Sequence, residues 1–155
     1  MDKILKYSLN IDNQPVIHSE AFIEKLFREW RVNEIYLGNV VTSFSNLIHL
    51  LIGHPENGMV DFIVRLKDEV LSFDIGGINA FVLSLFLKDY LLQEVSDNSS
   101  QSVFLIQKIA DKVSVEGENL VLQFNTGALP DAYLNHRKQV LKSFQEEPRE
   151  KNLND

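Results

Sequence analysis

Apolar residues recur along this chain with two different periods, and each period predicts a different kind of element. In several short runs the side chains roughly alternate between apolar and polar, a pattern typical of strands with one buried face. The runs predicted to be strands are 3–11, 59–66, 69–75, 113–116 and 119–125. The first suits an edge strand. Lys67-Asp68 and Gly117-Glu118 each separate two runs, so two hairpins are expected.

Other segments repeat apolar residues every three or four positions, which indicates helices with one buried face. The segments predicted to be helical are 19–31, 34–52, 80–95, 103–111 and 130–145. Ser19 and Asn33 stand where N-caps are expected, and Pro130 suits the first turn of the last helix. The predicted buried faces are Phe22, Ile23, Leu26, Phe27 and Trp30 in the first helix, and Tyr36, Val40, Phe44, Leu47, Ile48 and Leu51 in the second.

The order of these elements is strand, helix, helix, hairpin, helix, helix, hairpin, helix. Strands grouped as hairpins favour a mostly antiparallel sheet with the helices on one face. The expected fold class is therefore α+β, a two-layer α/β sandwich. One domain is expected over 1–128, followed by a C-terminal helix extension over 129–146. The charged segment 147–155 is predicted to be a disordered tail.

Composition and charge narrow the classes of function. The chain has 155 residues, of which 45% are hydrophobic and 24% charged, and this suits one globular domain. It has no cysteine, which excludes disulfides, thiolate metal sites and a cysteine nucleophile. Its net charge of −7 and its scattered basic residues disfavour direct nucleic-acid binding. A partner with a basic surface is favoured instead.

The sequence also argues against secretion and membrane insertion. The first residues, Met-Asp-Lys-Ile-Leu-Lys-Tyr, contain no signal-peptide apolar region. The longest apolar run, 80–92, is short for a bilayer and is interrupted by Ser84, Lys88 and Asp89. The expectation is therefore a cytoplasmic protein with no membrane partner.

The most informative stretch is 70–77, where a β-type run ends in Asp74 and is followed by Gly76-Gly77. An acid at the end of a strand can point into a cleft, and it can accept a hydrogen bond from an exocyclic amine such as that of adenine. Glycines beside it let a flat ligand approach the backbone closely. The alternative is an ordinary strand-to-loop turn, in which Asp and Gly are also common.

Three motifs carry a resemblance to a known family. Segment 103–125 contains Leu105-Ile106-Gln107 and Asp111-Lys112-Val113 before a hairpin. Upstream lie Phe73-Asp74-Ile75-Gly76-Gly77 and the helical segment 41–49, which contains Asn46. Together they resemble the histidine-kinase-like ATPase superfamily (GHKL), in its anti-sigma factor and switch-protein serine kinase branch. The resemblance covers about residues 3–126.

The resemblance implies that ATP and Mg²⁺ are ligands. In that family an Asp-x-Gly-x-Gly box binds adenine, a helical Asn helps hold Mg²⁺ on the nucleotide, and a glycine-rich loop binds phosphate. The nucleotide-binding residues that it implies here are Asp74, Gly76, Gly77, Asn46, Ser100 and Ser102, with Asn46 also at the metal.

This chain departs from the family pattern at the positions that do chemistry. Thr42 stands where the family has its catalytic Glu, and threonine is no general base at neutral pH. The second glycine of the adenine box is Ile78, and the phosphate loop has Ser100-Gln101-Ser102 in place of glycines. Each candidate also has a structural alternative: Asp74 as a turn residue, Asn46 as polar helix surface, and the two serines as a helix N-cap region.

The segment 80–92 lies where the family has a polar lid, yet it is apolar on nearly every face of the predicted helix. Such a helix must be buried on more than one side. One side can meet the sheet or a neighbouring helix, and the other must meet a partner, a second subunit, or the space that a nucleotide would otherwise occupy.

These observations favour a regulatory protein-binding domain that resembles an anti-sigma factor or partner-switch protein, with weak or lost ATP binding. The implied partner is a sigma factor or an anti-sigma antagonist. Two alternatives stay open. One is an active protein serine kinase or ATPase, although Glu34 lies two turns too early to replace the missing acid. The other is a structural module that forms a homodimer through 80–92.

Overall fold

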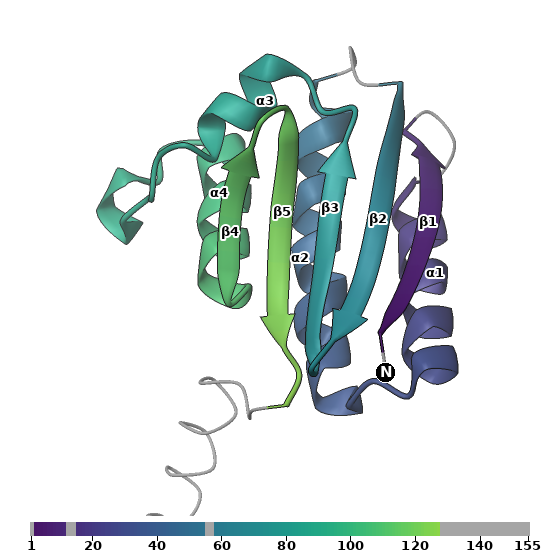
Figure 1. The fold of residues 1–155 in the computed structure, drawn as a ribbon. Helices are drawn as coiled ribbons and strands as arrows, with labels where there is room; N and C mark the ends of the chain where they lie inside the picture. Colours follow the sequence, from purple (N-terminus) through teal and green to yellow (C-terminus); the bar gives the residue numbers. More distant parts are fainter. Residues whose placement is uncertain (1, 12–14, 55–57, 128–155) are drawn as a thin grey trace, which may run out of the picture.

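Five antiparallel strands form one sheet, in the order β1-β2-β3-β5-β4, and the computed structural model describes them within residues 2–11, 15–54 and 58–127 (Figure 1). The strands are β1 (Lys3–Asn10), β2 (Met59–Lys67), β3 (Val70–Gly76), β4 (Lys112–Glu116) and β5 (Asn119–Asn125). The expected helix extension and tail lie outside the described residues.

The helices cover one face of this sheet. They are α1 (Pro15–Trp30), the 3-10 turn η1 (Glu34–Tyr36), α2 (Leu37–Ile52), α3 (Ala80–Leu85), the 3-10 turn η2 (Leu92–Glu94) and α4 (Asn98–Ile109). In Figure 1, α1, α2 and α4 lie side by side behind the strands, and α3 crosses the end of the sheet where β3 finishes. The predicted α+β fold, a two-layer sandwich with helices on one face, is confirmed.

Aromatic rings join the two layers at the centre of the core. Phe44 of α2 lies against Phe62 and Phe73, with ring centroids 5.5 and 4.6 Å apart. Phe73 in turn meets Phe124 of β5 at 6.0 Å. All six residues predicted to form the buried face of the second helix are buried. The helical period of that segment therefore identified the contact surface correctly.

The hairpin between β2 and β3 turns one residue later than predicted. Lys67 pairs with Val70, so the two turn residues are Asp68 and Glu69. Both have positive φ, 51° and 64°, as a type I′ turn requires. The twist of the paired strands favours this turn even though neither residue is glycine.

Two of the predicted N-caps have different outcomes. Asn33 caps the segment that begins at Glu34, since its Oδ1 accepts a hydrogen bond from the N–H of Ile35 at 3.1 Å. The prediction for Ser19 is wrong, because α1 begins at Pro15 and Ser19 lies buried inside it. Its hydroxyl donates to the carbonyl of Val16 at 2.9 Å.

The predicted helix over 80–95 is also wrong. Only 80–85 are α-helical, and Phe86 turns the chain into an irregular segment that leads to η2. The next helix begins at Asn98, five residues before the predicted start, because Asp97 caps it. Ser100 and Ser102 are therefore helical residues and not loop residues.

The segment Glu34–Ile52 is, within the described ranges, the one helix long and apolar enough to cross a membrane. The sequence analysis placed the longest apolar run at 80–92 and missed it. In this fold η1 and α2 form the central helix of the helical layer, and Phe44, Leu47 and Ile48 are buried there. Its apolar character is that of a core helix.

A glycine substitution tests the chain path beyond β3. Gly77 has φ of 86°, and a Cβ there would come 2.6 Å from the carbonyl oxygen of Met59. Gly117 has φ of 64° but open space around it. We expect Gly77→Ala to lower the free energy of unfolding by more than about 2 kcal/mol and Gly117→Ala by about 1 kcal/mol. Urea unfolding followed by circular dichroism measures both, and equal losses would contradict the close approach.

Candidate functional site

Asp74 lies on the face of the sheet that no described helix covers. Side chains alternate along β3, and Leu71, Phe73 and Ile75 are the buried ones that face the helices. Asp74 therefore points the other way, between Ile63 of β2 and Val121 of β5. β3 also continues to Gly76, so Asp74 is not the last residue of its strand. Its Oδ1 is buried and has no hydrogen-bond partner among the described residues.

Asn46 lies in the helical layer. Its side-chain amide donates to the carbonyl of Thr42 one turn earlier, at 2.9 Å. With Ser102 of α4 it lines a groove of about 570 Å³ between α2 and α4. The sheet therefore separates Asn46 and Ser102 from Asp74, and these three residues of the implied nucleotide site do not meet.

The two glycines of the implied adenine box have structural roles. Gly77 has positive φ and passes directly over the backbone of Met59. Gly76 is still part of β3, and a Cβ there would lie 3.2 Å from Oδ1 of Asn119. The close passage of the backbone explains Gly77 without a ligand, whereas Gly76 meets only the side chain of Asn119.

The side chain of Ser100 is used in hydrogen bonds at the start of α4. Its hydroxyl accepts hydrogen bonds from the N–H groups of Ser96 and Asp97, at 3.0 and 3.1 Å, and donates to the carbonyl of Asp97. Asp97 in return accepts from the N–H of Ser100 at 2.8 Å. This bond and the serine hydroxyl lower the pKa of Asp97 below its usual value. A negatively charged cap already satisfies this helix terminus, which disfavours phosphate there.

The groove between α2 and α4 is lined by uncharged polar residues, two histidines and two leucines. Nδ1 of His49 lies 2.8 Å from the carbonyl of Ser45, and the ring of His54 packs against Phe81, with centroids 5.0 Å apart. None of the described residues that line the groove is a carboxylate. The groove can hydrogen-bond a small polar molecule but supplies no acidic general base. Across the described ranges, no three His, Cys, Asp or Glu side chains are placed to hold a metal ion.

The residues present therefore do not fit ATP and Mg²⁺ as the family holds them. The implied adenine contact lies on one side of the sheet and the implied Mg²⁺ contact on the other. Residue 42 is threonine, and the implied phosphate residue Ser100 is used to cap α4.

The segment after β3 divides its apolar residues between the core and the surface. Val82, Leu83 and Phe86 are buried beside Ile78 and close the end of the core. Leu85 and Tyr90 are partly buried against the core, whereas Phe81, Leu87, Leu91 and Leu92 are exposed. The prediction that one side of this segment meets the body of the domain is correct, although an α-helix makes up only its first part.

Three leucines stand out from the surface on residues 86–95, which we call the leucine loop. Leu87, Leu91 and Leu92 are 74%, 53% and 72% exposed. Figure 1 shows the loop projecting from the side of the molecule formed by α4 and β4. Three large apolar side chains so exposed within six residues are unusual for a surface that meets only water.

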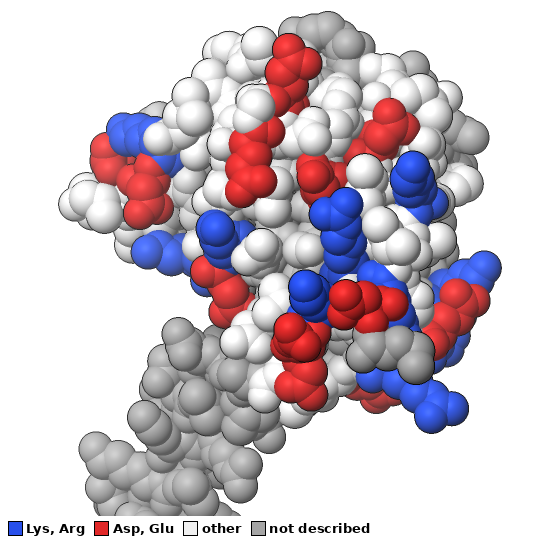
Figure 2. Space-filling view, viewed as in Figure 1, with Lys and Arg blue, Asp and Glu red and all other residues white. Residues whose placement is uncertain are grey.

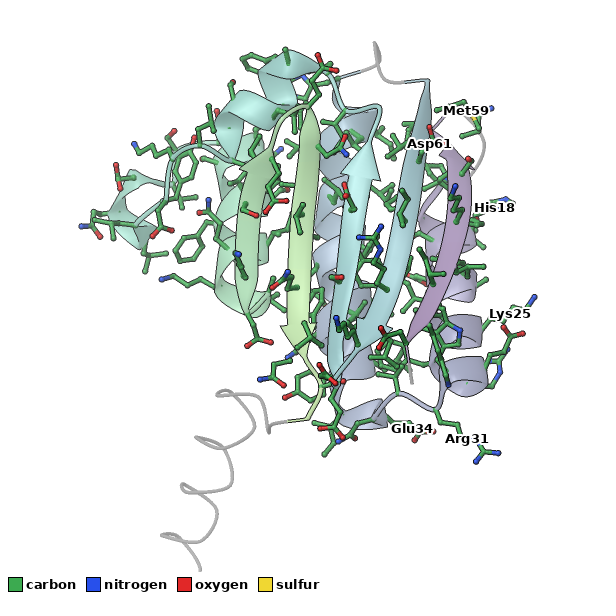
Figure 3. The ribbon with its side chains drawn as sticks, viewed as in Figure 1. His18, Lys25, Arg31, Glu34, Met59 and Asp61 are labelled. Carbon is green, nitrogen blue, oxygen red and sulfur yellow. The ribbon has the colours of Figure 1, made fainter. Side chains whose placement is uncertain are left out.

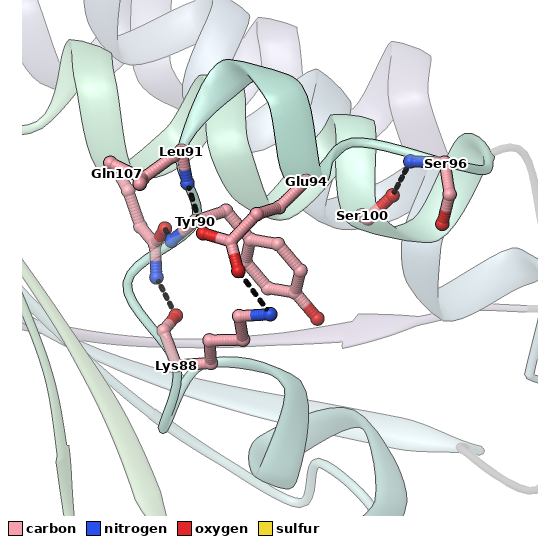
Figure 4. Close-up of polar contacts among 7 residues, drawn as sticks. All are labelled: Lys88, Tyr90, Leu91, Glu94, Ser96, Ser100 and Gln107. Carbon is pink, nitrogen blue, oxygen red and sulfur yellow. Dashed lines mark hydrogen bonds and ion pairs between the residues drawn. The ribbon is translucent and has the colours of Figure 1, made fainter.

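Polar contacts hold the leucine loop in one shape (Figure 4). Gln107 of α4 donates from Nε2 to the carbonyl of Lys88 at 2.7 Å, and its Oε1 accepts from the N–H of Tyr90 at 3.0 Å. Within the loop, Nζ of Lys88 lies 2.6 Å from Oε2 of Glu94. Oε1 of Glu94 accepts from the N–H of Leu91. The hydrogen bond with Lys88 lowers the pKa of Glu94, and the same bond raises the pKa of Lys88.

Sequence reasoning found the apolar residues of this loop but missed the residue that braces it. Gln107 was noted only as one member of a three-residue motif. Its role comes from hydrogen bonds to residues 17 and 19 positions earlier, which no local pattern shows.

Comparison with protein-family models and with curated proteins gives no match to this chain.

Two serine substitutions distinguish a capping role from ligand binding. Ser100→Ala removes the hydroxyl that two backbone N–H groups use, so we expect a loss of about 1–2 kcal/mol in the free energy of unfolding. Ser102→Ala, two residues further along α4 and in the groove, is the matched control and should change it by less than about 0.5 kcal/mol. Thermal or urea unfolding measures both, and a neutral Ser100→Ala would contradict the capping role.

Proposed function

We propose that this domain is a cytoplasmic regulatory protein that acts by binding another protein through the leucine loop, and that it does so without a nucleotide. The observation that carries the proposal is the exposure of Leu87, Leu91 and Leu92 on a braced loop. The partner class follows from the resemblance to anti-sigma factors and partner-switch proteins, and the net charge of −7 favours a basic surface on it.

The energetics of the leucine loop support binding. Burying one leucine against a partner contributes roughly 1.5–3 kcal/mol, so three such residues can anchor an interface. Association also costs conformational entropy when loops must be ordered. Because Gln107 and Glu94 already hold the backbone of the loop, much of that ordering precedes binding.

The same geometry disfavours the kinase alternative. Phosphoryl transfer needs the nucleotide, the metal and a base in one place. Here Asp74 and Asn46 lie on opposite faces of the sheet, and residue 42 is threonine. The segment that would have to open as a lid is anchored in the core by Val82 and Phe86.

Titration calorimetry with ATP and ADP, with and without Mg²⁺, tests the nucleotide part of this proposal. We expect no heat and no thermal shift at about 1 mM nucleotide, a concentration that would half-saturate a site whose binding free energy is about −4.1 kcal/mol. Asp74→Asn and Asn46→Ala should behave like the parent chain. Micromolar affinity that both substitutions weaken would overturn this part and support the kinase alternative.

A variant in which Leu87, Leu91 and Leu92 are all replaced by Asn tests whether the leucine loop binds the partner. The control replaces Ile17, Ile52 and Met59, which are similarly exposed elsewhere. Affinity capture from extract of the source cells, followed by mass spectrometry, should recover a partner with the parent and the control, and at least tenfold less of it with the leucine variant.

Two further measurements sharpen that experiment. Gln107→Ala keeps the leucines but removes the brace, so it should weaken capture without abolishing it. Equal recovery of the same proteins by parent and leucine variant would contradict the proposal. Light scattering decides the dimerisation alternative: a parent dimer that the leucine substitutions dissociate would show that the loop binds a second copy instead.

A further inference from the structure

The opposite edge of the sheet offers a second surface. β1 is an edge strand, and within the described residues it pairs with β2 alone. Residues 3–9 of this strand span about 23 Å, and no strand in the described part of the chain pairs with their outer edge. α1 runs behind this edge (Figure 1). An edge strand flanked by a helix is the arrangement in which proteins add an extended peptide to a sheet.

A groove of about 400 Å³ lies between β1 and α1. Its apolar lining is Leu5, Tyr7, Ala21, Phe22 and Leu26. Tyr7 and Phe22 stack with ring centroids 4.0 Å apart, which forms a flat wall, and partial burial raises the pKa of Tyr7. Leu5 and Tyr7 occupy the helix-facing positions of β1. Every second side chain of a strand added to β1 would point into this groove.

Two of the three charged residues described around the groove are basic, in a chain that is acidic overall. They are Lys6 and Lys25, and Figure 3 shows Lys25, with His18, on α1 along the β1 edge. The third is Glu29, which lies 3.8 Å from Lys25. Lys6 takes the opposite face of β1 from Leu5, where it would meet the other alternate residues of an added strand.

A second copy of this chain suits the edge poorly. Two β1 strands paired with each other would bring four lysines into one short ladder, because Lys3–Asn10 contains Lys3 and Lys6 but no acid. Like charges across a strand pair are destabilising. The uncovered face of the sheet carries both signs (Figure 2), and beside β1 it carries Asp61, which accepts a hydrogen bond from Ser8 at 2.6 Å, so the basic character is that of β1 itself.

We propose that β1 and the groove beside α1 bind an extended acidic segment of another protein, which adds to the sheet as a sixth strand. Its apolar alternate residues lie against Tyr7 and Phe22, and its carboxylates lie on the opposite face, near Lys6. This surface is separate from the leucine loop and does not depend on the function proposed above.

The probe is a fluorescein-labelled octapeptide, Glu-Val-Glu-Leu-Glu-Val-Glu-Leu, titrated with the full chain and read by fluorescence polarisation. One comparison peptide has Lys in place of every Glu. Another has the same composition with the four Glu grouped at one end, which destroys the alternation. We expect the alternating acidic peptide to bind at least tenfold more tightly than either.

Matched variants locate the binding. Ala21→Trp fills the groove from an exposed position, and Lys6→Glu reverses the charge on the edge strand; each should weaken binding at least tenfold. Glu24→Trp, exposed on α1 outside the groove, and Lys112→Glu, on the far edge strand, should leave it unchanged. The leucine-loop variant should also bind normally, which distinguishes this inference from the proposed function.

Three results would overturn the inference. The first is no binding of the acidic peptide at 1 mM. The second is equal affinity for the basic or the grouped peptide, which would show that neither charge nor alternation is recognised. The third is a dimer in light scattering that Ala21→Trp dissociates, since the groove would then belong to a second copy of the chain.

Discussion

The contact between Phe44 of α2 and Phe73 of β3, with ring centroids 4.6 Å apart, fixes the side of the sheet that each β3 residue faces. Strand side chains alternate strictly, so Phe73 inward means Asp74 outward. A slip of one residue would expose Leu71, Phe73 and Ile75, each of which contributes roughly 1.5–3 kcal/mol by burial. The core therefore decides the position of Asp74, whatever role a motif suggests for it.

With Asp74 fixed on the outer face of the sheet, the departures of this sequence from the family pattern all count against nucleotide chemistry. A threonine at residue 42, serines in place of phosphate-loop glycines and an apolar lid are each weak observations alone. The fold adds that Asp74 and Asn46 lie on opposite sides of the sheet. All four count against the nucleotide chemistry of that family, and for this reason we propose protein contact as the function. The fold itself keeps the element order and the antiparallel pairing that the hydrophobic pattern and the two hairpins predicted.

How far the sequence predicted the structure depended on the range of the interactions involved. Periodicity identified all five strands and the buried face of α2, because alternation and helical spacing directly reflect burial in a two-layer fold. It failed where a single contact sets a boundary. Asp97 starts α4 early through one capping interaction. The helix predicted over 80–95 ends at Leu85, after which Gln107 of α4 binds the backbone of Lys88 and Tyr90. Such partners lie far away along the chain, and local patterns carry no trace of them.

The face of the sheet on which Asp74 lies shows that prediction from sequence was limited in the candidate site as well. An alternating run predicts that one residue of each neighbouring pair is buried, and Phe73 beside Asp74 already indicated which one. The motif suggested a different assignment because it was compared by spacing and not by face. A carboxylate in a strand can contact a ligand in the helical layer only if its side chain lies on the same face of the sheet as the residues that face the helices. For a candidate site on a strand, the buried neighbours on either side are therefore a stronger test than the motif itself.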